Sequence, residues 1–146
     1  MNYPQKIFND LIFMIRPLET QLRDLLRKQG MQRLEWSVFY AIIHNPSLTA
    51  AELAQRLTIE KSNIAPIIKD LVHAGYVNVE TSKVDKRRKN LLITPEGMNK
   101  YKAIRVHIDA FQEEIVDGVT EEESKYLFRT IEKMKNNLHK RAGYKE

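Results

Sequence analysis

The stretch that decides the fold spans residues 49–94 and reads TAAELAQRLTIEKSNIAPIIKDLVHAGYVNVETSKVDKRRKNLLIT. It opens on Thr49-Ala-Ala-Glu52, a capping box in which the threonine and glutamate side chains satisfy each other's free amides at a helix start. This helix is predicted to end near Leu57. A second helix is predicted over roughly residues 61–74 and closes at Gly75, the residue type that best takes a left-handed helix end. Two short helices joined by a tight turn are typical of a helix-turn-helix.

After Gly75 the apolar pattern changes from helical spacing to alternation, which indicates extended chain. Residues 76–79 (YVNV) lead into a basic segment, and residues 89–94 (KNLLIT) lead out of it. The basic segment, residues 83–90, holds five cations and one acid. The pattern predicts a β-hairpin with a cationic tip.

Apolar residues at steps of three and four predict helices on both sides of this region. Before it, a long helix is predicted to end near Gly30 and to be bent or divided at Pro17, and a shorter one covers residues 34–44 and stops at Asn45-Pro46. After it, a helix begins at Thr94-Pro95 and breaks at Gly118. Residues 120–123 (TEEE) form a second capping box that opens the final helix. The fold class is therefore mainly α with a small β-hairpin wing (α+β), a winged helix-turn-helix core flanked by amino- and carboxy-terminal helices.

The amino-acid composition limits the kinds of partner and the cellular location to be expected. The formal charge of +5 suggests a polyanionic partner, and the positive charge is concentrated in the middle of the chain. The longest unbroken apolar run, Leu11 to Ile15, is too short to cross a bilayer, and no secretory signal is recognised. We therefore expect a cytoplasmic protein, nucleoid-associated when bound to DNA. The chain has no cysteine, so neither disulfides nor thiolate metal ligands are expected.

The helix over residues 61–74 is predicted to enter the major groove of double-stranded DNA. Its apolar residues Ile64, Ile67, Ile68 and Leu71 are expected to face inward. The predicted DNA-binding residues of this helix are Lys61, Ser62, Asn63, Pro66 and Lys69, and His73 is expected on the same side of the helix. Asn63 suits base reading, whereas Ser62 and the lysines suit phosphate contacts.

The predicted DNA-binding residues of the wing are Lys83, Lys86, Arg87, Arg88 and Lys89. An arginine on a narrow extended tip suits the negative potential of a narrow minor groove. An aspartate among so many cations is not expected to touch phosphate, so Asp85 is expected to brace a neighbouring cation by ion pairing.

Several segments of this chain resemble the MarR family of transcription regulators in order and spacing. They are Leu53-Ala54-Gln-Arg-Leu57, Ser62-Asn63-Ile64, Leu71, Gly75-Tyr76-Val77, Asp85-Lys-Arg87 and Ile93-Thr94-Pro-Glu-Gly97. The resemblance covers nearly the whole chain and implies a single module over residues 1–146, with a DNA-binding lobe at 34–94 and dimerisation helices at 1–33 and 95–142. It also implies that Arg87 lies near the minor groove and that Asp85 supports the wing. This chain differs from the family pattern at two positions. Pro66 stands where the family often has a polar or basic residue, and Ile93 stands in place of the usual leucine, which is a conservative change.

The same resemblance implies a homodimer joined through the first and the last two helices. The predicted dimerisation residues are Ile7, Leu11, Ile15, Phe111, Ile115, Leu127, Ile131 and Leu138.

The function that this resemblance implies is that of a prokaryotic repressor that binds a pseudo-palindromic operator and is released by a small, often aromatic, anion lodged between the dimerisation helices and the DNA-binding lobe. No cofactor, metal or membrane partner is expected. Two alternatives stay open: a metal-responsive regulator using His44, His73, His107 and His139, and a protein-docking module without operator binding. Catalysis is not expected, because no glycine-rich phosphate loop, serine elbow or HExxH motif is present in the sequence.

Overall fold

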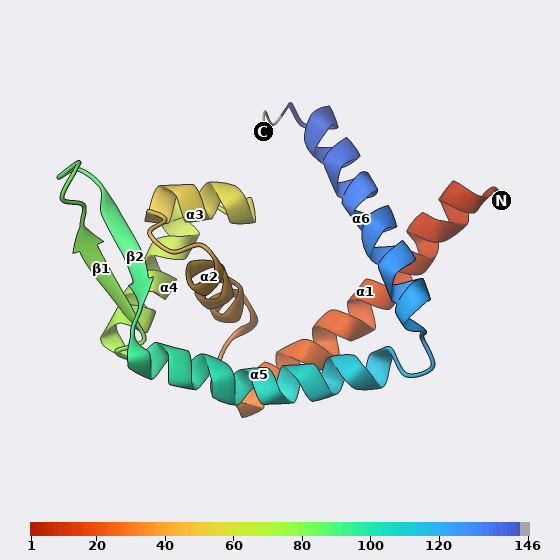
Figure 1. The fold of residues 1–146 in the computed structure, drawn as a ribbon, viewed down its shortest axis with the longest axis horizontal. Coiled ribbons are helices and arrows are strands. Elements are labelled where there is room, and N and C mark those ends of the chain that lie inside the picture. Colours follow the sequence, from red (N-terminus) through yellow and green to blue (C-terminus); the bar gives the residue numbers. More distant parts are fainter. Residues whose placement is uncertain (144–146) are drawn as a thin grey trace. The chain divides into compact units, whose positions relative to one another are not determined.

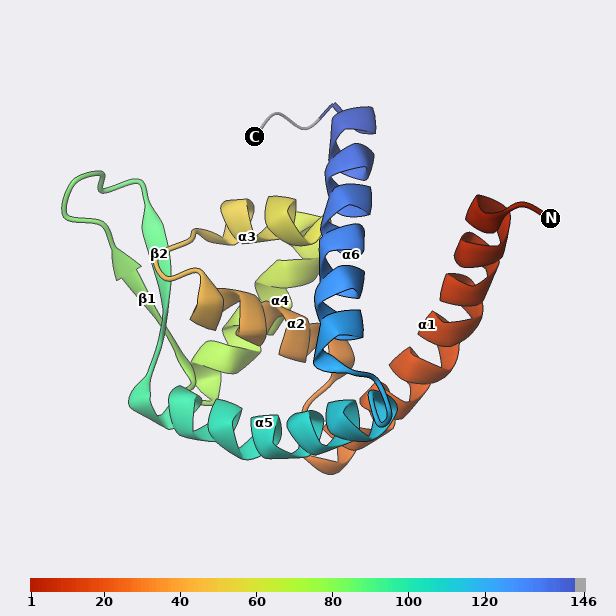
Figure 2. The same cartoon turned by 45° about the vertical axis from the view of Figure 1, so that its right-hand side comes forward.

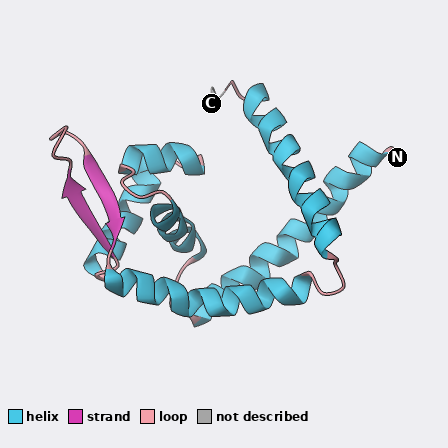
Figure 3. Ribbon diagram, viewed as in Figure 1, coloured by secondary structure: helices cyan, strands magenta, loops and turns pink. Residues whose placement is uncertain are grey.

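The computed structural model describes residues 1–143, and this part of the chain forms six helices and one antiparallel pair of strands (Figure 1, Figure 3). In chain order the elements are α1 (Tyr3–Lys28), α2 (Arg33–His44), α3 (Ala50–Leu57), α4 (Lys61–His73), β1 (Val77–Thr81), β2 (Lys89–Ile93), α5 (Pro95–Ile115) and α6 (Glu121–Arg141). The predicted fold class, mainly helical with a β-hairpin wing, is confirmed. Met1–Asp109 form one compact unit, and the described residues from Ala110 onward form a second.

The helix starts follow from local sequence. The predicted capping box of α3 is present: the Thr49 hydroxyl accepts a hydrogen bond from the Glu52 amide at 3.2 Å, and Glu52 accepts one from the Thr49 amide at 3.3 Å. Thr120 and Glu123 form the same reciprocal pair at the start of α6. Each pair satisfies main-chain donors that have no partner within their helix.

The hydrophobic core of the first unit is built on α2, whose Val38 and Phe39 are fully buried. Leu53 of α3 and Leu71 of α4 are also fully buried, so both helices of the helix-turn-helix direct their apolar face into this core. The carboxyl-terminal part of α1 and the part of α5 up to Ile108 complete it. Their buried residues are Leu26, Ile104 and Ile108.

The wing is joined to the loop that precedes α3. The two strands pair with Val77 opposite Ile93, and Leu91 of β2 also donates its amide to the Leu48 carbonyl at 2.8 Å. The Ser47 amide returns a hydrogen bond to the Leu91 carbonyl at 3.3 Å. Figure 2 lets the reader follow this loop beside β2. The base of the hairpin is therefore held to the helical core through the main chain.

Helix α1 has two different halves. Leu26 near its end is fully buried, whereas Phe8 and Ile12 near its beginning are more than half exposed. The helix is continuous through Pro17, so of the two predicted outcomes the division is wrong, whereas the bend stays a prediction. A proline removes one main-chain hydrogen bond, and the turns on both sides supply enough others to keep the helix intact.

The first turn of α5 lies directly against the wing. Thr94 accepts a hydrogen bond from the Gly97 amide at 2.9 Å and donates its hydroxyl to the Gly75 carbonyl at 2.6 Å, so the predicted cap at Thr94 is present. A methyl group at Gly97 would overlap the main-chain carbonyl of Tyr76. Glycine is therefore required here by the close approach of two backbones, not by its own backbone angles.

We predict that Gly97→Ala destabilises the protein by about 1–3 kcal/mol, because a main-chain obstacle cannot be relieved by a side-chain rotation. Urea unfolding followed by circular dichroism measures the loss. The exposed Asn99→Ala in the same helix is the control and should change the free energy of unfolding by less than about 0.5 kcal/mol. Equal stability of the two variants would contradict the close approach.

Candidate nucleic-acid interface

Helix α4 presents a polar face to solvent because its apolar face is held in the core. Ile64 and Leu71 are fully buried and Ile68 is 8% exposed. Ile67, also predicted to face inward, is half-buried. The side chains predicted to contact DNA are all exposed: Lys61, Ser62, Asn63, Pro66 and Lys69, together with His73.

A tight turn sets α4 against α3. Thr58 ends α3 in the left-handed conformation, with φ of 55°, and its amide bonds back to the carbonyls of Ala54 and Gln55. Helix α4 then begins at Lys61, after Glu60 in the capping position. In helix-turn-helix proteins that bind DNA, the amino-terminal residues of the second helix contact base edges.

The tip of the wing is shaped by short polar contacts within it. The Ser82 hydroxyl accepts hydrogen bonds from the amides of Val84 and Asp85 at 3.2 and 3.3 Å. One carboxylate oxygen of Asp85 accepts from the Arg87 amide at 3.0 Å and from Arg87 Nε at 3.2 Å. This is the kind of ion pair that the sequence predicted for Asp85, although its bracing role in DNA binding stays a prediction.

These contacts change the pKa of Asp85. The Arg87 main-chain amide lowers it most, the Arg87 side-chain hydrogen bond and the charge of Arg88 lower it further, and burial opposes them. The Asp85 carboxyl therefore has a pKa below its usual value and is an anion at neutral pH.

The wing cations fall into two groups. Lys83, Lys86, Arg87 and Lys89 are exposed, and the side chain of Arg87 keeps 92% of its surface in solvent. Arg88 is half-buried, and its Nη2 lies 2.6 Å from a carboxylate oxygen of Glu52 in α3. Sequence reasoning placed Arg88 with the DNA-binding residues and did not identify Glu52 as its partner. No local pattern could have revealed a contact between residues so far apart in the chain.

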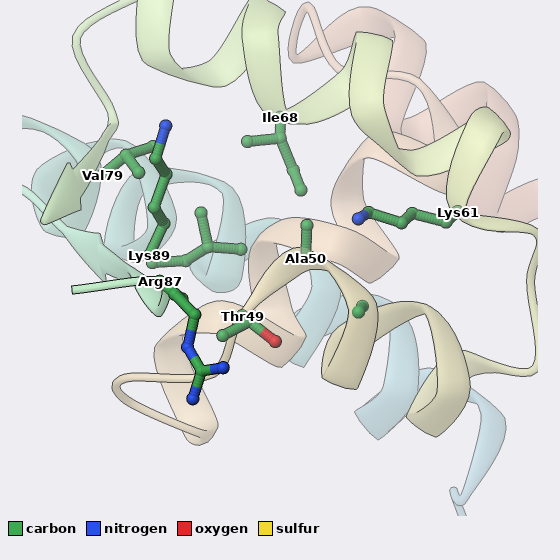
Figure 4. Close-up of a pocket in the computed structure, with 9 residues that line it drawn as sticks. Thr49, Ala50, Lys61, Ile68, Val79, Arg87 and Lys89 are labelled. Atoms are coloured by element: carbon green, nitrogen blue, oxygen red, sulfur yellow. The ribbon is translucent and has the colours of Figure 1, made fainter. Parts of the chain in front are cut away.

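A pocket of about 380 Å³ lies where the wing, α3 and α4 meet (Figure 4). Its lining residues are Thr49, Ala50, Ala51, Lys61, Ile68, Val79, Arg87, Lys89 and Leu91. Three of them are cations, Lys61 from α4 and Arg87 and Lys89 from the wing. The structure thus brings together predicted site residues of the helix and of the wing around one anion-attracting hollow.

The predicted dimerisation residues lie on three helices. In the first unit, Ile7 and Ile15 of α1 are exposed and Leu11 is half-buried. In the second, Ile115, Leu127, Ile131 and Leu138 are exposed by 40–62%, and Phe111 is half-buried.

Residues 1–143 also bear on two other kinds of site. No group of three or more histidine, aspartate or glutamate side chains in that range could hold a metal ion. None of the described helices is long and apolar enough to cross a membrane.

Comparison with known proteins gives consistent matches. A family model described as "MarR family" matches residues 29–88. An HTH-type transcriptional regulator of Staphylococcus aureus (strain MSSA476) is 29% identical over 136 residues, which cover 93% of this chain and 92% of the relative. An HTH-type transcriptional regulator of Bacillus subtilis (strain 168) is 28% identical over 117 residues, covering 78% of this chain and 85% of the relative.

Solved structures share the fold. A Staphylococcus aureus MarR structure in complex with salicylate and kanamycin superposes with a TM-score of 0.82 at 24% identity and covers 94% of this chain and 93% of its own. A MarR protein from Peptoclostridium difficile superposes with a TM-score of 0.77 at 25% identity and covers 92% of this chain and 88% of its own.

The Arg87 amide donates a hydrogen bond to the Asp85 carboxylate, so its NMR chemical shift reports the titration of that carboxyl. We predict that this shift titrates with a midpoint below the usual aspartate pKa of about 3.9. Because the folded-state pKa of Asp85 is lowered, its contribution to stability is present above the unfolded value and is lost as the pH falls through the folded value. Arg87→Gln should raise the midpoint only in part, since the main-chain amide is the larger cause. A midpoint at or above about 3.9 in the unmodified protein would contradict the described wing tip.

Proposed function

Because this chain belongs to the MarR family of transcription regulators, we propose that it represses transcription as a homodimer that binds a pseudo-palindromic operator in double-stranded DNA. The family predicted from the sequence is confirmed by the family model and the relatives. One observation carries the DNA-binding proposal: exposed cations of the wing and of the first turn of α4 line the same hollow. A phosphate backbone is the polyanion that such a paired surface fits.

In this proposal α4 enters the major groove and the wing lies along the backbone towards the minor groove. Asn63, exposed in the first turn of α4, reads a base edge, while Lys61 and Lys69 hold phosphates. Arg87 extends from the wing tip into the narrow minor groove. Two such units about one helical turn apart would read half-sites with centres about 10 bp apart. Occupying the operator would block polymerase.

The exposed apolar side chains of the terminal helices support the dimer. Ile7 and Ile15 of α1 keep nearly half of their surface in solvent, as does Ile115 at the end of α5. Leu127 and Leu138 of α6 are more than half exposed. Single exposed apolar residues are ordinary, but regular rows along helices are a common feature of protein interfaces.

A small-molecule effector is part of the same proposal. One solved structure with this fold was obtained in complex with salicylate, which is a small aromatic carboxylate. In this chain an anion in the pocket beside Lys61 and Arg87 would use cations that the proposal assigns to DNA, so the two ligands would compete. The site predicted from the sequence, between the dimerisation helices and the DNA-binding lobe, stays an alternative.

The metal-responsive alternative has no supporting cluster of ligands within residues 1–143. The docking-module alternative predicts a purified protein that does not bind duplex DNA at low salt. A gel shift with competitor DNA separates that outcome from the proposal.

We predict that Asn63→Ala weakens binding to the operator by about 1–3 kcal/mol and leaves non-specific binding nearly unchanged, because it removes a base contact. Arg87→Ala and Lys69→Ala should instead weaken binding to all sequences and reduce the slope of log affinity against log salt by about 1 each. Fluorescence anisotropy across salt concentrations measures both effects. Lys102→Ala removes an exposed cation of α5 and is the control. Unchanged binding in all three site variants would reject this surface as the interface.

We predict that Leu127→Glu shifts the protein from dimer to monomer and weakens operator binding with it, because a charge would be buried in the interface. Sedimentation velocity reports the oligomeric state. Asn136→Glu adds the same charge on the opposite side of α6 and should leave the dimer intact. A Leu127→Glu protein that stays dimeric would place the interface elsewhere.

A further inference from the structure

We propose that Arg88 is a positioning residue that clamps the wing to the start of α3 through Glu52, and that it makes no phosphate contact of its own. The proposal rests on the DNA-binding function proposed above and assigns one of its residues a different role. It replaces the expectation, drawn from the charge of the basic segment, that Arg88 binds DNA beside Arg87.

The contacts of Arg88 point towards the protein. Its Nη2 lies 2.6 Å from Glu52 Oε1 and donates to the Ser47 carbonyl at 2.9 Å, while its Nε donates to Asn90 Oδ1 at 2.9 Å. The three acceptors belong to α3, to the loop before α3 and to β2. A planar guanidinium with several donors in a fixed arrangement is suited to joining three segments in one geometry.

The partner carboxylate is itself held in place. The oxygen of Glu52 that pairs with Arg88 also accepts hydrogen bonds from the Thr49 hydroxyl at 3.0 Å and from the Thr49 amide at 3.3 Å. These Thr49 bonds are the main cause of the lowered pKa of Glu52, and the charge of Arg88 adds to it. Glu52 therefore offers Arg88 a fixed anion at the start of α3, not a flexible surface side chain.

Arg87, the adjacent residue, is arranged in the opposite way. Its Nε pairs with Asp85 inside the same turn, and its side chain is 92% exposed, against 38% for Arg88. The two consecutive arginines of the wing thus have different partners: one lies in the solvent at the tip, and the other lies against the helical core.

The clamp extends the attachment of the wing towards its tip. Lower in the hairpin, Leu91 is joined by main-chain hydrogen bonds to Ser47 and Leu48. Arg88 lies beyond this point, where its carbonyl accepts the Ser82 amide at 2.8 Å as the hairpin opens into the tip. Since both ions of the pair are partly exposed, the pair adds little stability. What it supplies is a wing already held at one angle to α3 and α4, which lowers the ordering cost of binding.

Arg88→Ala and Glu52→Gln test the clamp, with Arg87→Ala for comparison. Glutamine at position 52 can keep the capping box but removes the charge that holds Arg88. We expect Arg88→Ala and Glu52→Gln each to weaken DNA binding by about three- to tenfold with an unchanged salt slope. The double variant should be no weaker than the single ones, because both remove one interaction. Arg88→Lys, which keeps the charge without the planar fork, should recover only part of the affinity.

The sign of the Glu52→Gln effect is decisive. If Arg88 bound phosphate, removing its acidic competitor would strengthen DNA binding, and Arg88→Ala would reduce the salt slope by about 1, as Arg87→Ala does. Either result would overturn the proposal.

Amide hydrogen exchange without DNA separates this proposal from the one on function. Arg88→Ala and Glu52→Gln should speed exchange of the Ser82 amide, whereas Arg87→Ala should not. Unchanged exchange in both clamp variants would overturn the clamp even in a protein that binds DNA. An unmodified protein that binds no duplex at low salt would overturn the proposed function, while the exchange data would still decide the clamp.

Discussion

The burial of one face of α4 is the constraint on which the rest of the candidate interface depends. Ile64 and Leu71 are fully buried, and Ile68 nearly so, in a core shared with α2 and α3. A helix is rigid, so burying this row sets its rotation about its own axis. The residues on the other side, among them Asn63 and Lys69, then face solvent whatever their own preferences. The position of the polar face of α4 is in this sense a product of hydrophobic packing.

The tip of the wing is placed by a different kind of force. Main-chain hydrogen bonds between Leu91 and the Ser47–Leu48 loop hold the base of the wing, and polar side chains shape its tip. Few apolar atoms are involved beyond the base, so the geometry of the tip depends on charges and hydrogen bonds that salt and pH can weaken. The core therefore holds all of one face of α4 but only the base of the hairpin, through Val77 and Leu91, and it does not hold the tip.

Much of this arrangement could be predicted from the sequence because its determinants are local. The capping boxes at Thr49 and Thr120, the stop at Gly75 and the change of period after it all lie within a few residues of what they specify. The pairing of Arg88 with Glu52 could not be predicted, since it depends on how separate elements approach each other. Judged by charge alone, Arg87 and Arg88 had the same predicted role in DNA binding. The continuity of α1 through Pro17 could not be predicted either, because one missing hydrogen bond does not decide between a continuous and a divided helix.

Helix α1 gives the molecule a mechanical property. Its 26 residues make a rod about 39 Å long, with Leu26 sunk in the core at one end and Phe8 on the surface at the other. The amino-terminal end of α1, around Phe8, is therefore an accessible point of contact on the same helix. Phe8 and Leu26 lie on one continuous helix, so a partner that binds Phe8 is connected through α1 to the core around Leu26.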